Sequence, residues 1–275
     1  MTSGCHSRDV VVIIGAGGMG LAVARRLAFE KHVLLADFQE TTLYQALSTL
    51  QKDGISAEAH KVDIADYPSV EALAQAAQSA GHISVIVHTA GLSPAAASAR
   101  DIYAVDLLGT ANIIEAFSYV ACKGTSLTCI ASMAGHFISF SPDLERHLAT
   151  APLSRLLDHE ELDLESENCN LAYTVSKRAN ILRVQGAAKA WGDRYARLNS
   201  ISPGVIATPL LISQLDSPLG ASPKALVEVS ALKRMGTPDE IASVAAFLAG
   251  PESMYITGTD IIVDGGTVSA RKWSK

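Results

Sequence analysis

The sequence lacks the features that mark several classes of protein. No uninterrupted apolar run approaches the roughly 20 residues that a membrane-spanning helix needs, so we expect no membrane partner. The opening residues, MTSGCHSRDV, hold no apolar core of a secretory signal, which predicts a cytoplasmic protein. The net charge is −6, whereas a nucleic-acid partner normally requires a basic patch, so we expect no nucleic acid.

Cysteine, repeats and flexible linkers are also scarce. The four cysteines, Cys5, Cys122, Cys129 and Cys169, form no CxxC or Cys/His pattern, which predicts reduced thiols and no metal site. No internal repeat or low-complexity linker divides the chain. A length of 275 residues falls within the range of single parallel α/β domains, so we predict one domain over residues 1–275.

Short runs rich in Val and Ile alternate with longer stretches of helical character. Several of the short runs are apolar at every position, as in a parallel sheet that helices cover on both faces. This order predicts an α/β fold, a Rossmann-type doubly wound parallel sheet of about seven strands. The expected strands are 10–14, 33–36, 55–62, 84–87, 127–131, 197–202 and 261–263, and the clearest helices are 21–29, 69–78, 107–117, 172–191 and 238–248.

Two segments interrupt this alternation. Residues 136–170 are polar and acidic, and we interpret them as an insertion near the substrate site; Ser141-Pro142-Asp143 within it predicts the start of a short helix. Residues 210–236 are punctuated by proline and serine, which predicts a mobile flap.

A glycine-rich turn follows the first expected strand. In Gly15-Ala-Gly17-Gly18-Met19-Gly20 the first, third and last residues satisfy GxGxxG. In a dinucleotide site the first glycine permits a tight turn, the second admits the pyrophosphate and the third allows close packing of helix on strand. Free N–H groups at the helix start would face the phosphates. A purely structural strand–helix turn is the alternative.

Asp37 closes the second expected strand, about 20 residues after the glycine turn. A carboxylate there would accept both hydroxyls of the adenosine ribose and repel a 2′-phosphate, which favours NAD over NADP; the neighbouring Phe38 is not basic. A solvated aspartate at a strand end is the alternative. Asp63, followed by Ile64 after the third strand, is a candidate acceptor for the adenine amino group.

Three residues form a candidate reaction centre. Tyr173 and Lys177 lie four residues apart on an expected helix and share one face. An ammonium beside a phenol favours the phenolate, as a general acid/base for an alcohol oxygen requires. Ser132 follows an expected strand, at the edge where ligands bind in open parallel sheets. Alone, the Tyr–Lys pair is common on ordinary helices and the serine is an ordinary turn residue; their combination favours catalysis.

Together these motifs resemble the short-chain dehydrogenase/reductase family, in its compact single-domain branch, over nearly the whole chain. Further matching segments are His88-Thr-Ala-Gly91, Tyr173-Thr-Val-Ser-Lys177, Pro203-Gly204-Val-Ile206-Ala-Thr208, Arg234-Met-Gly-Thr-Pro-Asp-Glu240, Tyr255-Ile-Thr-Gly258 and Asp264-Gly-Gly266.

The resemblance implies a role for each matched residue. Tyr173 would transfer the hydroxyl proton, Lys177 would hold the nicotinamide ribose and keep Tyr173 acidic, and Ser132 would orient the carbonyl. The remaining cofactor contacts implied are Met19 at the pyrophosphate, Ala90 and Gly91 at the nicotinamide ribose, and Ile206 and Thr208, in the segment that begins with Pro203 and Gly204, at the carboxamide.

Three positions depart from the family pattern. The glycine turn is one residue shorter than the usual GxxxGxG, and His88 and Thr89 replace two asparagines. Asp106 stands where relatives carry an asparagine that holds a water beside the lysine. An ionised carboxylate accepts from that water but cannot donate to it, and it could also pair with Lys177 and alter the pKa of Tyr173. We therefore count Asp106 among the catalytic residues and expect catalysis to survive with a shifted pH profile.

The function expected is transfer of a hydride between NAD(H) and a secondary alcohol or ketone. The aliphatic side chains of the flap and the insertion favour an apolar or cyclic substrate, by analogy hydroxysteroid-like or carbonyl reductase-like. Two alternatives stay open: a 3-oxoacyl thioester reductase, whose usual NADP preference conflicts with Asp37, and an NAD-sensing regulatory protein without turnover. The resemblance also implies a homodimer or homotetramer, formed through the helix that carries Tyr173 and the helix before it.

Overall fold

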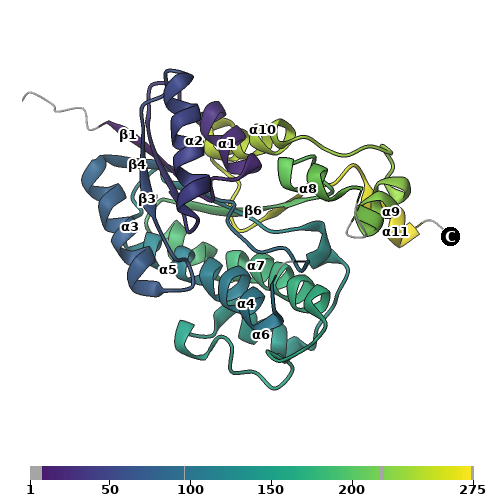
Figure 1. Cartoon of the computed structure of the whole chain (residues 1–275). Coiled ribbons are helices and arrows are strands. Elements are labelled where there is room, and N and C mark those ends of the chain that lie inside the picture. Colours follow the sequence, from purple (N-terminus) through teal and green to yellow (C-terminus); the bar gives the residue numbers. More distant parts are fainter. Residues whose placement is uncertain (1–7, 96, 217–219, 274–275) are drawn as a thin grey trace, which may run out of the picture.

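The computed structural model describes residues 8–95, 97–216 and 220–273, which form a parallel sheet between two layers of helices (Figure 1). The sheet has seven strands in the order β3-β2-β1-β4-β5-β6-β7, which confirms the doubly wound prediction. The strands are β1 (Asp9–Ile14), β2 (His32–Asp37), β3 (Ala57–Lys61), β4 (His82–His88), β5 (Ser126–Ile130), β6 (Arg197–Pro203) and β7 (Asp260–Val263).

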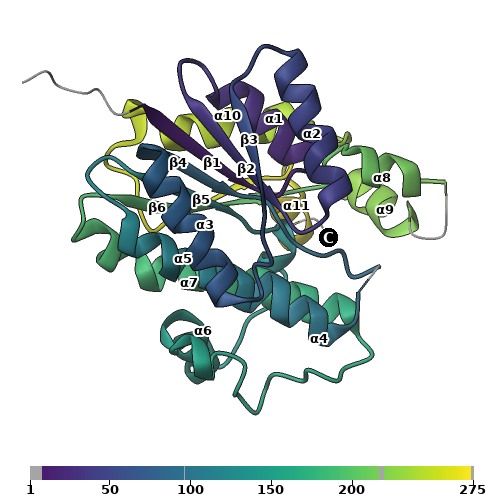
Figure 2. The same ribbon diagram turned by 60° about the vertical axis from the view of Figure 1, so that its left-hand side comes forward.

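Helices α1, α2 and α10 cover one face of the sheet, and α3, α5 and α7 cover the other (Figures 1 and 2). The α-helices are α1 (Gly18–Leu27), α2 (Glu40–Lys52), α3 (Tyr67–Ala80), α4 (Ala99–Ile102), α5 (Thr110–Val120), α6 (Pro142–Thr150), α7 (Cys169–Gly192), α8 (Pro209–Gln214), α9 (Ala221–Val229), α10 (Pro238–Ala249) and α11 (Thr267–Trp273). A π-helix, η1 (Tyr103–Gly109), joins α4 to α5, and short 3-10 turns are η2 (Met133–His136), η3 (Leu153–Arg155) and η5 (Pro251–Ser253).

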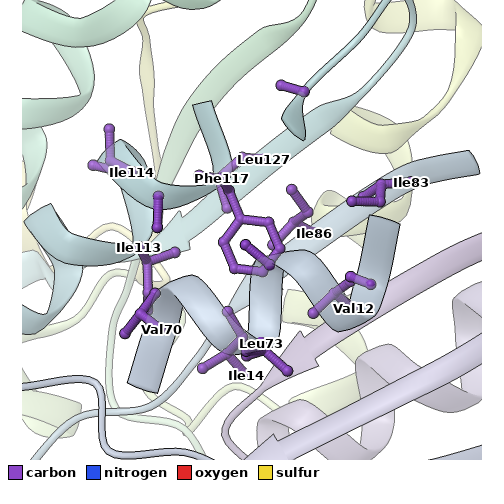
Figure 3. Packing of buried hydrophobic residues seen from close by; sticks show 14 of the residues in the cluster. Val12, Ile14, Val70, Leu73, Ile83, Ile86, Ile113, Ile114, Phe117 and Leu127 are labelled. Carbon is purple, nitrogen blue, oxygen red and sulfur yellow. The ribbon is translucent and has the colours of Figure 1, made fainter. Parts of the chain in front are cut away.

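Strands β1, β2 and β4 are apolar over most of their length because both of their faces are buried. Along β1, Val10, Val12 and Ile14 belong to the cluster beneath α3 and α5, whereas Val11 and Ile13 belong to the cluster beneath α1 and α10. Figure 3 shows the first cluster gathered around Phe117. Successive strand residues point to opposite faces, so a strand between two helical layers loses the usual polar alternation.

The structure adds or moves three elements relative to the sequence-based expectation. Helix α2 was not expected; it buries only Leu43, Ala46 and Leu50, so its apolar stripe is narrow. The edge strand β3 is shorter than 55–62 and has no fully buried residue. The expected helix 107–117 is split, because residues Tyr103–Gly109 take π-helical geometry before α5 begins.

The insertion folds against the outer side of α7 (Figure 1). The expected helix is α6: Pro142 occupies its first turn and the Ser141 hydroxyl accepts from the Leu144 N–H at 3.2 Å. The insertion shares one apolar cluster with α7, which contains Leu144, Leu148, Leu156, Leu162, Ala172, Val175, Ala179 and Leu182. Two polar contacts join the same surfaces, one from Arg178 to Glu145 at 2.7 Å and one from Arg183 to the Ala151 carbonyl at 2.6 Å.

In the described parts of the chain, no helix is both long enough and apolar enough to span a bilayer.

Candidate active site

Many of the predicted site residues end or follow strands of the parallel sheet, so they lie along the carboxyl ends of the strands. The strand order reverses between β1 and β4, the place where open parallel sheets bind ligands. The chain after β4 closes onto the end of β1, because the N–H groups of Thr89 and Ala90 donate to the Ile14 carbonyl at 2.7 and 3.0 Å. The glycine turn and the Ala90-Gly91 segment are therefore neighbours.

Glycine is required at two positions of the turn. Gly15 has φ of +103°, and a Cβ there would lie 2.5 Å from the Thr89 hydroxyl. A Cβ on Gly20 would lie 1.8 Å from the Gly15 carbonyl oxygen, so only glycine lets α1 start this close to β1. The turn keeps these two contacts although it is one residue shorter than the usual family pattern.

The start of α1 suits a pyrophosphate. Helix α1 begins at Gly18, and in the described chain no side chain caps its first turn and no acid lies within it. A Cβ on Gly17 would meet no atom within 4 Å, so space above the turn is open. Unpaired N–H groups at a helix start attract anions, and Met19 lies among them. The residues present therefore fit the phosphates of a dinucleotide.

Asp37 ends β2 beside the glycine turn. Its carboxylate accepts from the Ala16 N–H at 2.7 Å and from the Gln39 N–H at 2.8 Å, which fixes it beside the glycine turn. The neighbouring Phe38 is 55% exposed. One strand further out, Asp63 accepts from the Ala65 N–H at 2.9 Å.

Ile64 has a structural contact that the sequence did not indicate. It is buried, and a Cβ on Gly109 would lie 2.8 Å from its side chain. Its carbonyl accepts from the Asn112 amide at 2.9 Å. Ile64 thus ties the end of β3 to the start of α5.

The three candidate reacting residues come from two elements that touch. Ser132 caps η2, and its hydroxyl oxygen accepts from the Ala134 N–H at 3.1 Å. Tyr173 and Lys177 lie on α7, with the Lys177 ammonium 5.3 Å from the centre of the Tyr173 ring. A Cβ on Gly135 would lie 2.8 Å from the backbone nitrogen of Arg178, so η2 rests directly on the α7 backbone at this point.

Asp106 forms a buried ion pair with Lys177. The side chain of Asp106 is 0% exposed, and its Oδ2 lies 3.3 Å from the Lys177 Nζ; Oδ1 accepts from the Leu92 N–H at 2.6 Å. Burial raises the pKa of Asp106, against the opposing effect of the ammonium. Burial alone would lower the pKa of Lys177, but attraction to Asp106 and Tyr173 raises it. The residue that departs from the family pattern is therefore a direct partner of the lysine.

A second buried contact, from His88, supports the π-helix that carries Asp106. The Thr110 hydroxyl donates to the Asp106 carbonyl at 2.8 Å, so its oxygen accepts from His88 Nε2 at 3.0 Å. Burial, and then the charge of Lys177, lower the pKa of His88 to about 3. Sequence reasoning noted His88 only as a replaced asparagine and missed Thr110, because nothing local links β4 to α5.

The segment after β6 lies against both the end of β7 and the glycine turn. A Cβ on Gly204 would lie 2.7 Å from the Asp264 Cα, so Pro203-Gly204 passes close to the end of β7. Ile206 makes an isolated bridge with Gly236, and Thr208 caps α8 by accepting from the Leu211 N–H at 3.2 Å. A Cβ on Gly18 would lie 2.9 Å from the Pro209 Cδ, so the base of the flap touches the glycine turn.

Gly91 completes the junction between the cofactor edge and the reacting residues. A Cβ on Gly91 would lie 3.1 Å from the Lys177 Nζ and 3.2 Å from the Asp106 Oδ1. The Ala90-Gly91 segment therefore lies against the ion pair, and the glycine turn and the Tyr–Lys pair face one region.

Comparison with known proteins agrees with this architecture. The family model "short chain dehydrogenase" matches residues 9–141, and the model "Enoyl-(Acyl carrier protein) reductase" matches residues 163–268. The short-chain dehydrogenase/reductase bsc3 of Alternaria brassicicola is 39% identical over 96% of this chain and 97% of its own length. This chain belongs to the short-chain dehydrogenase/reductase family. These matches confirm the resemblance drawn from the motifs. The family consists of oxidoreductases that bind nicotinamide cofactors.

Two further relatives cover most of their own length. The 3-alpha-hydroxysteroid dehydrogenase/carbonyl reductase of Comamonas testosteroni is 31% identical over 94% of this chain and 96% of that protein. A solved short-chain type dehydrogenase/reductase from Mycobacterium ulcerans superposes with a TM-score of 0.74 at 23% identity, covering 95% of this chain and 90% of that one. At that identity the structural match shows the fold alone.

Proposed function

We propose that this short-chain dehydrogenase/reductase transfers a hydride between NAD(H) and a secondary alcohol or ketone, with Tyr173 as the proton-transferring residue. The observation that supports the proposal is that Lys177 lies beside both the Tyr173 ring and Gly91, while the turn that follows Ser132 rests on the α7 backbone. The bound nicotinamide would supply the hydride chemistry, and the protein would supply orientation and proton transfer.

The side chains would divide the work as follows. Ser132 Oγ already accepts one hydrogen bond from Ala134, which leaves its own hydrogen free to donate to a substrate oxygen. The Tyr173 hydroxyl would give a proton to that oxygen during ketone reduction and take it during alcohol oxidation. Lys177 would favour the phenolate and hold the nicotinamide ribose. The negative charge of Asp106 would partly offset the ammonium and so limit how far Lys177 lowers the pKa of Tyr173.

The proposed cofactor is NAD rather than NADP. Asp37 lies at the end of β2, held beside the glycine turn by the Ala16 N–H. A carboxylate there would accept hydrogen bonds from two ribose hydroxyls and repel a 2′-phosphate. Phe38 and the glycine turn supply no positive charge that would offset the repulsion.

We propose an apolar or cyclic substrate. The insertion and the flap contribute aliphatic side chains, among them the partly buried Ile138 and the exposed Leu210 and Ile212. The relative from Comamonas testosteroni is named for a hydroxysteroid and for carbonyl reduction, which is consistent with such a substrate. Several cations of these segments are already paired, Arg155 with Asp158, Lys224 with Asp216 and Arg234 with Glu240, which argues against a phosphorylated substrate.

We also propose a homodimer or homotetramer, with a limit on its geometry. The insertion covers the outer side of α7 from Ala172 to Leu182, so a dimer through α7 and α5 would use the insertion surface or the exposed end of α7 near Lys189. Sedimentation analysis of the intact chain tests this proposal.

The decisive experiment is a turnover screen of cyclic secondary alcohols with NAD and NADP, run on the wild type and on Tyr173→Phe. We expect turnover with NAD, at least ten-fold weaker turnover with NADP, and a loss of about 10²–10⁴-fold in Tyr173→Phe. Full turnover of Tyr173→Phe would refute the mechanism. Tight NAD binding without turnover of any alcohol would favour the NAD-sensing protein instead.

A further inference from the structure

The turn that carries Ser132 is held from three sides. Gly135 rests on the α7 backbone, as described above. The Phe137 ring lies under the guanidinium of Arg271 from α11, at 4.1 Å from the ring centre. His136, between these two residues, reaches across to β7. The short turn η2 thus contacts a helix that bears Lys177, the C-terminal helix and the edge of the sheet.

His136 meets a carboxylate that is itself fully engaged. Its Nε2 lies 2.8 Å from the Asp260 Oδ2 and 3.3 Å from the Ser202 hydroxyl. The other carboxylate oxygen, Oδ1, accepts from Ser200 at 2.6 Å and from Ser202 at 3.0 Å. The Asp260 side chain is only 6% exposed, and because it is an acceptor, His136 Nε2 must carry the hydrogen.

We propose that His136 is a positioning residue for the reaction, and that its bond to Asp260 fixes the turn from which Ser132 acts. The hydrogen bond from the Ala134 N–H to Ser132 Oγ restricts the orientation of the serine hydroxyl, whose own hydrogen stays available for a substrate oxygen. That N–H belongs to η2, and His136 is the last residue of η2.

The location of His136 explains why such an anchor is useful. His136 is the first residue of the insertion, which runs to the start of α7. Because the insertion is continuous with η2, a displacement of the insertion would also displace η2 and Ser132. The hydrogen bond from His136 to Asp260 opposes this displacement, because Asp260 lies in the sheet and pairs with Ser200 in the β6–β7 register.

The first test does not depend on any substrate. Amide hydrogen exchange of the full chain should be at least about ten-fold faster at Ala134, Gly135 and Phe137 in His136→Ala than in the wild type, because their bonds lie within η2. Exchange in the core strand β1 should be unchanged. Unaltered exchange at Ala134 and Gly135 would overturn the proposal, whatever the enzyme's substrate proves to be.

The second test rests on the proposed function and uses its best alcohol substrate. We expect His136→Ala to lower kcat by about 10- to 100-fold while NAD affinity, measured by fluorescence titration, stays the same. In a Ser132→Ala background the same substitution should have no further effect, because His136 acts through Ser132. His136→Gln, which can still donate to Asp260, should recover part of kcat. Equal losses in both backgrounds would contradict the proposal.

The control is a histidine–aspartate pair at the amino ends of two central strands. His82 Nδ1 lies 3.0 Å from Asp9 Oδ1, where β4 and β1 begin. His82→Ala should change neither kcat nor exchange in η2. If His82→Ala lowered kcat as much as His136→Ala, the effect would be general and the assignment to Ser132 would be wrong. If the wild type turned over no alcohol, the proposed function would fail, while the exchange test would still show whether His136 holds η2 in place.

Discussion

Helix α7 has two covered faces that differ in chemistry. The face toward the sheet carries Tyr173, Lys177 and the buried amide of Asn180. The opposite face carries small and aliphatic residues, Ala172, Val175, Ala179 and Leu182, beneath the leucines of the insertion. No residue from Ala172 to Val184 in this described stretch is exposed. The outer face buries mainly apolar surface, together with the contacts of Arg178 and Arg183 to the insertion, and stabilises the fold. The inner face holds a buried ion pair and other polar groups that are costly to bury.

The largest effect should come from the outer face. Leu148 is fully buried between α6 and α7, so Leu148→Ala should lower the free energy of unfolding by about 2–5 kcal/mol through lost burial and a cavity. Leu210, on the flap, is 62% exposed, and Leu210→Ala should change it by less than about 0.5 kcal/mol. Chemical denaturation measures both. A loss below about 1 kcal/mol in Leu148→Ala would mean that the insertion is only loosely attached.

A smaller effect on the free energy of unfolding should come from His88, a buried histidine at the end of β4 whose pKa is lowered by burial and by Lys177. His88 has a folded pKa of about 3, whereas the unfolded chain protonates near pH 6.5. Below pH 6.5 the unfolded state therefore binds more protons, and stability falls as the pH drops toward 3. The contribution of His88 to this slope is at most about 1.4 kcal/mol per pH unit.

Unfolding measured from pH 7.5 to 5 in the wild type and in His88→Asn isolates that slope. The variant carries no group that titrates in this range at the position, so its stability should depend less steeply on pH. Parallel curves would show that His88 does not remain neutral in the folded protein.

The smallest shift should appear in catalysis. In Asp106→Asn the Lys177 ammonium loses its counter-charge, so it favours the Tyr173 phenolate more strongly. The pH of half-maximal alcohol oxidation should move down by about one unit. Asp101→Asn makes the same charge change on the exposed side of α4 and should leave the profile in place. Superimposable profiles for Asp106→Asn and wild type would show that the ion pair does not tune the reaction.

The outer face of α7 could have been anticipated in part. The sequence from Ala172 to Val184 mixes apolar residues with charged ones such as Lys177, Arg178 and Arg183, so its pattern did not indicate that both faces are buried. The insertion was expected beside the substrate site, with a short helix near Ser141, and that helix is α6. The pattern did not reveal that the insertion leucines pack on α7, because contacts between segments distant in sequence leave no periodic signal.

By itself, the sequence determined the sheet, the glycine turn and the Tyr–Lys spacing, because strand and helix periodicity, close backbone approach at Gly15 and Gly20, and a shared helix face all act over a few residues. The sequence left open whether Asp106 pairs with Lys177, and only the tertiary structure decided this, together with the link from Thr110 to His88 and the contact of His136 with Asp260. These partners lie tens of residues apart, and packing of the elements across the sheet brings them within hydrogen-bond distance.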